Sequence, residues 1–197
     1  MPSAADPERR QFYRVEDRVG VEYRPVQGEL KGPLEPLFDG GELLPLEEEF
    51  RRYDSEIRHQ IGLISESDRN LAQLAKALND KLDTIARIMA FQQKPLQDDQ
   101  WLPVTLSEGG IAFPVTDPAP SENDQLAVRL TLLPELTQVV ALGRVVSVEA
   151  GDSATRVHLR FVGLEDHERQ QIARHVLRIQ ARERQQQRQR DDQENDG

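Results

Sequence analysis

The chain has 197 residues, of which 30% are charged and 37% hydrophobic, and its formal net charge is -10 at pH 7. This length allows one ordinary domain with an additional element, and the modest hydrophobic fraction indicates that much of the chain faces water. The acidic balance argues against DNA or RNA as the main partner.

Cellular location and redox chemistry are also constrained by the composition. The chain contains no cysteine, which excludes disulfides and thiolate zinc sites. The N-terminal segment lacks the apolar core of a signal peptide, and no run reaches the ~18 apolar residues that a membrane span needs. We therefore expect a cytoplasmic protein.

The first element in chain order is a strand. Residues 1–8 have the composition of a disordered segment, and Val19, Val21 and Tyr23 then alternate with polar residues and glycine. This period of two predicts a half-buried strand within residues 10–24. Residues 25–45 are rich in proline and glycine, which predicts a linker with one short helical turn around residues 34–38.

Residues 46–94 carry apolar side chains with helical spacing and no proline. A seven-residue repeat, flanked by further apolar positions, supplies the side chains that we expect in an oligomer interface: Phe50, Ile57, Ile64, Leu71, Leu74, Leu78, Leu82, Ile85 and Met89. A strict heptad predicts one long helix in a coiled coil, and the width of the stripe favours three or four helices or packing on the protein's own domain. The mixed charges of the polar face argue against a helix lying on a membrane.

One polar stretch, residues 65–70, interrupts the flanking apolar positions and allows an alternative. It could be a turn that joins two antiparallel helices. The heptad phase is preserved from Ile64 to Leu71, which a loop would have no reason to do. This preserved phase favours one continuous helix.

After Pro95 the period changes to two. Residues 101–106, 110–115, 126–132, 140–148 and 157–161 are predicted strands, and their spacing is typical of an all-β barrel or sandwich. Because a barrel needs closed edges, we expect the strand within residues 10–24 to pair with these later strands. Either the linker runs back along the helix or the first strand joins a neighbouring subunit. Residues 165–182 predict a closing helix, and residues 183–197 a charged disordered tail.

Catalytic motifs are absent from the sequence. His167 and Glu168 resemble the start of a zinc-protease helix, but Gln171 stands where the second histidine would be. No glycine-rich phosphate loop and no Gly-x-Ser-x-Gly elbow occurs. The sequence therefore predicts neither an enzyme nor a bound metal or cofactor.

Two other groups are candidates for ligand binding. Arg10 and Arg14 lie four apart just before the first strand. Arginine binds phosphate and the O6/N7 edge of guanine with paired hydrogen bonds. In the turn from Thr105 to Gly110, the Ser107 hydroxyl and exposed backbone N–H groups could hold an anion or a base edge. Taken singly, each group is also typical of solvated surface or of an ordinary turn.

The order of these features resembles the PilZ domain family: Arg10-x-x-x-Arg14, a strand, then Ser107-x-x-Gly110 in a turn, and a closing helix. The resemblance covers residues 9–24 and 97–182. It implies an α+β fold, a six-stranded antiparallel β-barrel with a long inserted coiled-coil helix and a C-terminal helix. It also implies a non-enzymatic bacterial protein that binds cyclic di-GMP through the residues of both motifs. Further candidates for contact with this ligand are Thr105, Arg144, Arg156 and Arg160.

Two features depart from the usual family pattern. Thr105 stands where the family turn has Asp or Asn, and threonine cannot offer a carboxylate or amide to the ring N–H and amino group of guanine. The inserted helix resembles that of a non-standard branch whose helices assemble the barrels into tetramers, and members of that branch need not bind the nucleotide. The sequence thus supports two hypotheses. One is a signalling adaptor that forms a homo-oligomer, with a tetramer expected, and senses cyclic di-GMP. The other is an assembly protein that acts through protein partners, such as motility or pilus machinery.

Overall fold

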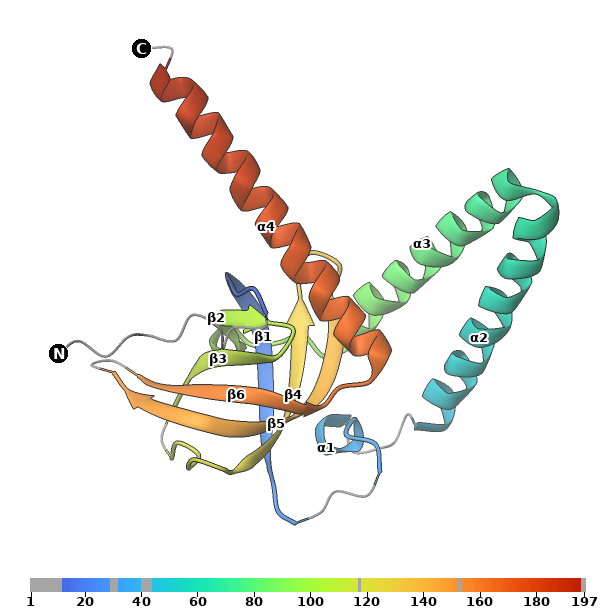
Figure 1. Cartoon of the computed structure of the whole chain (residues 1–197). Coiled ribbons are helices and arrows are strands. Elements are labelled where there is room, and N and C mark those ends of the chain that lie inside the picture. Colours follow the sequence, from blue (N-terminus) through green and yellow to red (C-terminus); the bar gives the residue numbers. More distant parts are fainter. Residues whose placement is uncertain (1–11, 29–31, 40–43, 117, 152–153, 196–197) are drawn as a thin grey trace.

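The chain forms a closed antiparallel barrel with helices extending from it (Figure 1). The computed structural model describes residues 12–28, 32–39, 44–116, 118–151 and 154–195. The strand order around the barrel is β1-β2-β3-β6-β5-β4. The six strands are β1 (Val15–Val26), β2 (Trp101–Ser107), β3 (Gly110–Val115), β4 (Gln125–Leu132), β5 (Thr137–Ala150) and β6 (Thr155–Gly163). The predicted six-stranded barrel is confirmed.

Strand β1 pairs with β2 on one side and with β4 on the other. Its first half is aligned with β2, where Val15 lies opposite Leu106, and its second half with β4, where Tyr23 lies opposite Val128. The strand that precedes the helical insertion therefore closes the barrel of its own chain. An exchange of this strand between subunits is not needed to complete the sheet.

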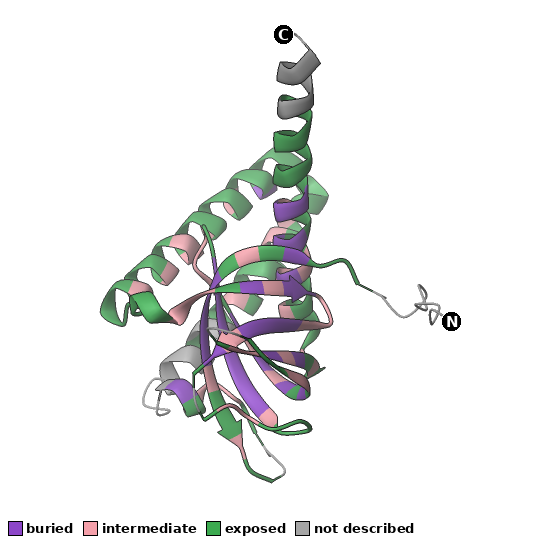
Figure 2. Cartoon of the chain, turned by 90° about the vertical axis from the view of Figure 1, so that its left-hand side faces the viewer, coloured by how far each residue is buried: buried purple, intermediate pink, exposed green. Residues whose placement is uncertain are grey.

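The barrel core consists of side chains that alternate inward along every strand. Among the described residues, the largest fully buried ones are Phe113, Leu106, Leu126, Leu130, Leu132, Ile172, Val19, Val104, Val128, Val139, Val145 and Val157. Ile172 belongs to the C-terminal helix α4 (Asp166–Asn195), and its neighbours Val176 and Ile179 are buried in the same cluster. Figure 2 shows the buried surface concentrated on the strands and on the part of α4 nearest to them. Helix α4 therefore belongs to the core of the barrel.

The helical insertion consists of a short helix α1 (Pro36–Asp39) followed by two longer helices, α2 (Leu44–Ser67) and α3 (Arg69–Gln93). The interpretation of residues 46–94 as one continuous helix is wrong. Asp68 has an extended backbone, and its carboxylate accepts hydrogen bonds from the backbone N–H groups of Asn70 (2.9 Å) and Leu71 (3.0 Å). This N-cap begins a new helix, because it satisfies donors that have no partner within α3. The chain reverses there, and α2 and α3 form a hairpin (Figure 1).

The apolar face of α2 is turned toward α3. Ile57, Ile61 and Ile64 line a groove of about 370 Å³ together with Ala75 of α3. The two helices also bring carboxylates together: burial, and then the charge of Asp54 on α2, raise the pKa of Asp83 on α3. The α2 members of the predicted heptad therefore face the other arm of the hairpin. The side chain of Phe50, the first of them, lies outside the described residues.

Helix α3 carries a second apolar stripe that α2 does not cover. The exposed side chains of this stripe are Leu71, Leu74, Leu78, Leu82, Ile85, Ile88 and Met89. Leu82 is the most exposed of them, at 64%. Their three- and four-residue spacing places them on one side of α3, whereas the buried Ala72 lies on another side. We call these seven residues the α3 stripe.

The C-terminal end of α3 is fixed to the barrel by hydrogen bonds to backbone carbonyls. The Arg87 side chain donates to the carbonyl of Glu135 in the β4–β5 turn (3.0 Å). Lys94, the residue after the helix, donates to the carbonyl of Phe38 in α1 (3.1 Å). The hairpin is thus held at its α3 end and extends away from the barrel (Figure 1).

Helix α4 is longer than the sequence predicted. It continues through Asn195, so residues 183–195 are helical and the expected disordered tail over residues 183–197 is corrected. This stretch consists mostly of glutamine, arginine and acidic residues, which favour helix without needing a core face. It projects away from the barrel and diverges from the α2–α3 hairpin (Figure 1).

Four side chains from three parts of the fold attach α4 to the barrel, and we call them the α4 anchor: Asp17, Glu135, His175 and Arg178. The His175 ring is 3% exposed, with Nε2 2.6 Å from the Asp17 carboxylate and Nδ1 2.7 Å from the Arg178 guanidinium. Because arginine can only donate, Nδ1 accepts and Nε2–H donates to Asp17. Arg178 also donates to the Glu135 carboxylate and to the carbonyl of Leu133.

The electrostatics of the α4 anchor favour the charged form of its carboxylate. Burial alone would raise the pKa of Asp17, but the His175 hydrogen bond, a backbone N–H and nearby positive charges hold it below the ordinary value of 3.8. A carboxylate with a lowered pKa in the folded state stabilises the protein above its unfolded pKa. That contribution is lost as the pH falls through the folded pKa.

Replacing the central imidazole tests the α4 anchor. We expect His175→Ala to lower the free energy of unfolding at pH 7 by about 2–4 kcal/mol, because it leaves a cavity in place of a buried ring and removes one hydrogen bond each from Asp17 and Arg178. The loss should shrink in acid, where Asp17 is protonated in both proteins. His167→Ala, at an exposed position of the same helix, serves as the control and should change stability little. Equal denaturant midpoints for the two variants would contradict a stabilising role of His175 in the α4 anchor.

Candidate functional site

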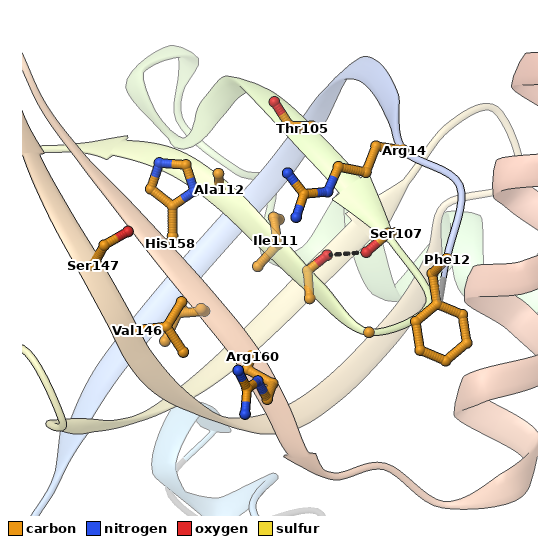
Figure 3. A pocket seen from close by; sticks show the side chains of 13 residues that line it. Phe12, Arg14, Thr105, Ser107, Ile111, Ala112, Val146, Ser147, His158 and Arg160 are labelled. Carbon is orange, nitrogen blue, oxygen red and sulfur yellow. Dashed lines mark hydrogen bonds between the residues drawn. The ribbon is translucent and has the colours of Figure 1, made fainter. Parts of the chain in front are cut away.

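A pocket of about 570 Å³ lies on the outer face of the barrel (Figure 3). Strands β2, β3, β5 and β6 form its floor, and the segment before β1 forms one wall. Its lining residues are Phe12, Arg14, Thr105, Ser107, Gly109, Gly110, Ile111, Ala112, Val146, Ser147, His158, Leu159 and Arg160. Its volume is within the range of sites that hold a drug-sized ligand.

The floor of the pocket follows from the sheet register. Thr105 lies opposite Ala112, which lies opposite His158, and His158 lies opposite Ser147, so these residues form a row across four strands. A register shift between Val145 and Ser147 leaves Val146 as an extra residue on β5. Such a bulge redirects a side chain, and Val146 lines the pocket.

Five of the residues singled out in the sequence meet in this pocket: Arg14, Thr105, Ser107, Gly110 and Arg160. In Figure 3 the Arg14 side chain reaches over the floor toward Thr105 and Ser107. Positions far apart in the chain are thus brought together by the pairing of β1 with β2.

The other candidates lie at the edge of the pocket or beyond it. Arg156 does not line the pocket but is bonded to Thr105, which does. Arg144 lies opposite Arg160 on the neighbouring strand and is exposed, outside the pocket lining. Arg10, the first residue of the arginine pair, lies outside the described residues.

The glycine turn between β2 and β3 has a packing role of its own. Ser107 Oγ donates to the carbonyl of Gly110 (3.2 Å), which closes the turn. A Cβ on Gly110 would lie 2.1 Å from the carbonyl oxygen of Leu159, so no larger residue fits between the paired strands. This close approach requires glycine at position 110 whether or not a ligand is bound.

Thr105 lies in the middle of a hydrogen-bonded chain. Its hydroxyl donates to the Glu16 carboxylate (2.6 Å) and accepts from the Arg156 guanidinium (2.8 Å). Arg156 also donates to the carbonyl of Ala112 (3.3 Å). The threonine hydroxyl is therefore engaged on both sides, and the carboxylate next to it comes from β1.

Sequence reasoning missed two of the side chains that define the pocket. Phe12 lies between the two arginines of the first motif, and its ring lies at the β2–β3 turn (Figure 3). His158 lies on the outer face of β6 between Arg156 and Arg160. The period-two alternation of this strand could have predicted that all three residues share one face. The Nε2 atom of His158 lies 3.2 Å from the Glu149 carboxylate without an aligned hydrogen bond.

The chemistry of the pocket suits binding of an anion. Among the described residues, the charged side chains that line it are those of Arg14 and Arg160, although the chain as a whole carries a net charge of -10. Within the described ranges, no three His, Asp or Glu side chains cluster closely enough to hold a metal ion. In the same part of the chain, none of the helices combines the length and apolar character needed to cross a membrane.

Comparison with known proteins finds one family model that matches part of the chain. Residues 92–178 match the family model of the PilZ domain, from the end of α3 through β6 and into α4. The match does not include β1, which lies on the other side of the helical insertion. No curated protein matches the sequence significantly.

One of the solved structures that match shares the fold over most of the chain. A Xanthomonas campestris protein, described as a tetrameric PilZ domain self-assembled via an unusual helical bundle, superposes with a TM-score of 0.51. It is 18% identical, and the alignment covers 86% of this chain and 89% of that one. Escherichia coli YcgR in complex with cyclic di-GMP matches with a TM-score of 0.39 at 13% identity, over 45% of this chain and 38% of that one. A Bacillus subtilis inhibitor of motility gives 0.39 at 19% identity, over 43% of each chain.

Proposed function

We propose that this chain, whose residues 92–178 match the PilZ domain model, is a non-enzymatic signalling adaptor that binds cyclic di-GMP in the outer-face pocket. In this proposal it acts in the cytoplasm as a homo-oligomer held together by the helical insertion. The observation that carries the proposal is the meeting of Arg14 with Ser107, Gly110 and Arg160 around one pocket. These residues come from the two motifs and from a third strand.

The pocket chemistry matches the chemistry of the ligand. A cyclic dinucleotide presents two phosphates and two guanine bases with O6 and N7 acceptors. Guanidinium groups form paired hydrogen bonds with both kinds of acceptor and also stack on aromatic rings. Arg14 and Arg160 would bind phosphate or guanine, with Arg10 joining them from the same arm and Arg144 or Arg156 from the rim. Ser107 would contact the ligand from the turn.

The α3 stripe supports the self-association part of the proposal. Large apolar side chains on one side of an extended helix are costly to leave in water, and full burial of one such side chain stabilises by roughly 1.5–3 kcal/mol. The side chains of the α3 stripe are about half exposed, so covering them would add on the order of 1 kcal/mol for each. We propose that stripes from different copies pack together. A tetramer is the favoured assembly, as described for the Xanthomonas campestris protein.

A second function has its own supporting observation. The Thr105 hydroxyl is already engaged by Glu16 and Arg156, and it offers no carboxylate or amide to a guanine. Together with the extended α3 stripe, this favours an assembly protein that does not bind the nucleotide and acts through protein partners. The motility or pilus machinery that the family resemblance implies would supply such partners. The two functions differ in one measurable property, the affinity for cyclic di-GMP.

Calorimetry with cyclic di-GMP decides between them. We expect the wild type to bind with measurable heat, and Arg14→Ala to weaken binding at least about tenfold, because it removes charge-assisted hydrogen bonds. Arg10→Ala/Arg14→Ala should abolish the heat. Arg169→Ala removes an exposed arginine of α4 and should leave binding unchanged. Wild-type protein that gives no heat at high micromolar ligand would reject nucleotide sensing and favour the assembly function.

Light scattering tests the α3 stripe. We expect the wild type to have close to four times the chain mass of 22.5 kDa, and Leu78→Asp/Leu82→Asp to dissociate, because two charges would enter the apolar interface. Gln73→Asp/Lys76→Gln changes the net charge of α3 by the same amount at exposed positions outside the stripe and should keep the native mass. A Leu78→Asp/Leu82→Asp variant that keeps the wild-type mass would contradict self-association through α3.

A further inference from the structure

Gly109, in the β2–β3 turn, has no conformational reason to be glycine. Its φ is not in the left-handed region, unlike that of Gly28 and Gly32. A Cβ at position 109 would lie 2.8 Å from Cδ2 and 3.1 Å from Cε2 of Phe12. The three atoms nearest to that position all belong to the Phe12 ring, so the ring occupies the space that a side chain would take.

The surface under the Phe12 ring is a fixed part of the barrel. The carbonyl of Gly109 accepts a hydrogen bond from the backbone N–H of Phe161 on β6 (3.0 Å). Ser107 closes the same turn through the carbonyl of Gly110. The turn is thus held at its own backbone and by the neighbouring strand, and it cannot readily move aside.

Phe12 and Arg14 face the pocket together, whereas the residue between them does not. Both line the pocket, and Phe12 is 37% exposed, while Tyr13 is 61% exposed and lies outside the lining. Residues 12 and 14 therefore lie on the pocket side of this segment, and Tyr13 between them faces solvent. The contact of Phe12 with Gly109 therefore also determines where Arg14 lies (Figure 3).

We propose that Phe12 is a positioning residue that docks the segment before β1 onto Gly109 and holds Arg14 over the pocket before any ligand arrives. The inference rests on the proposed function, since the pocket is the one assigned to cyclic di-GMP. A binding segment that is ordered in advance loses less conformational entropy when the ligand binds, so affinity rises without a new ligand contact. Glycine at position 109 keeps the docking surface open.

Proteolysis without ligand tests the docking itself. Phe12→Ala and Gly109→Ala should each speed trypsin cleavage after Arg14 about tenfold, because both separate the ring from the turn. Tyr13→Ala and Glu108→Ala, at the two adjacent positions, are the controls and should leave the rate unchanged. The conservative variant Phe12→Tyr keeps the ring and should also behave as the wild type. All variants should keep the wild-type denaturation midpoint.

Calorimetry with cyclic di-GMP on the same variants tests whether the contact between Phe12 and Gly109 raises the affinity for the ligand. Phe12→Ala and Gly109→Ala should raise the dissociation constant about fivefold to tenfold, and the three other variants should not. If the wild type binds and these two variants bind equally well, positioning by Phe12 is overturned while the proposed function stands. A lowered denaturation midpoint in Phe12→Ala would equally overturn it, by showing a general structural role. A wild type that does not bind cyclic di-GMP overturns the proposed function and, with it, the role of Phe12 in ligand binding. The proteolysis rates then test only the contact between Phe12 and Gly109.

Discussion

The backbone pairing of β1 with both β2 and β4 is the contact on which the other parts of the structure depend. A sheet without β1 would leave the edges of β2 and β4 unpaired, and exposed edges invite association with other chains. The residues that β1 contributes to the core, Val15, Val19 and Val21, are all buried. One strand of 12 residues, β1, thus completes a barrel whose remaining strands follow the helical insertion.

The same pairing fixes the geometry of the pocket. Arg14 directly precedes β1, and Val15 lies opposite Leu106, so the register places the arginine beside the turn that follows β2. The register also puts Glu16 opposite Thr105, where the two side chains are hydrogen bonded. Asp17, next along β1, belongs to the α4 anchor. Pocket, barrel closure and the attachment of α4 therefore share three consecutive residues of one strand.

Much of this arrangement could be predicted from the sequence because strands have a simple period. The alternation of Val19, Val21 and Tyr23 predicted β1, and the later runs predicted β2 to β6 with small errors at their ends. Placing Arg14 near Ser107 required the resemblance to a family, because the spacing alone does not say which strands pair. The roles of Phe12 and Gly109 depend on a contact between distant segments, and no local pattern reports such a contact.

The errors in the prediction of the helices have a local cause. Asp68 has the residue type of an N-cap, but the heptad phase is the same on both sides of it, so periodicity could not separate one helix from two. The hairpin gives the two halves different surroundings: the apolar face of α2 lines a groove toward α3, while the α3 stripe is exposed. In α4, residues 183–195 lack an apolar face, and a polar composition alone does not distinguish a solvated helix from a disordered tail.

A disulfide between β1 and β4 tests barrel closure most directly. Val26 and Gln125 lie opposite each other at the end of the pairing, and the chain has no other cysteine to interfere with Val26→Cys/Gln125→Cys. Electrophoresis under denaturing, non-reducing conditions should show an oxidised product with the mass of one chain, because β1 closes the barrel of its own chain. Covalent dimers or larger species as the main product would show that β1 is exchanged between subunits, and would contradict the account given for the barrel and its pocket.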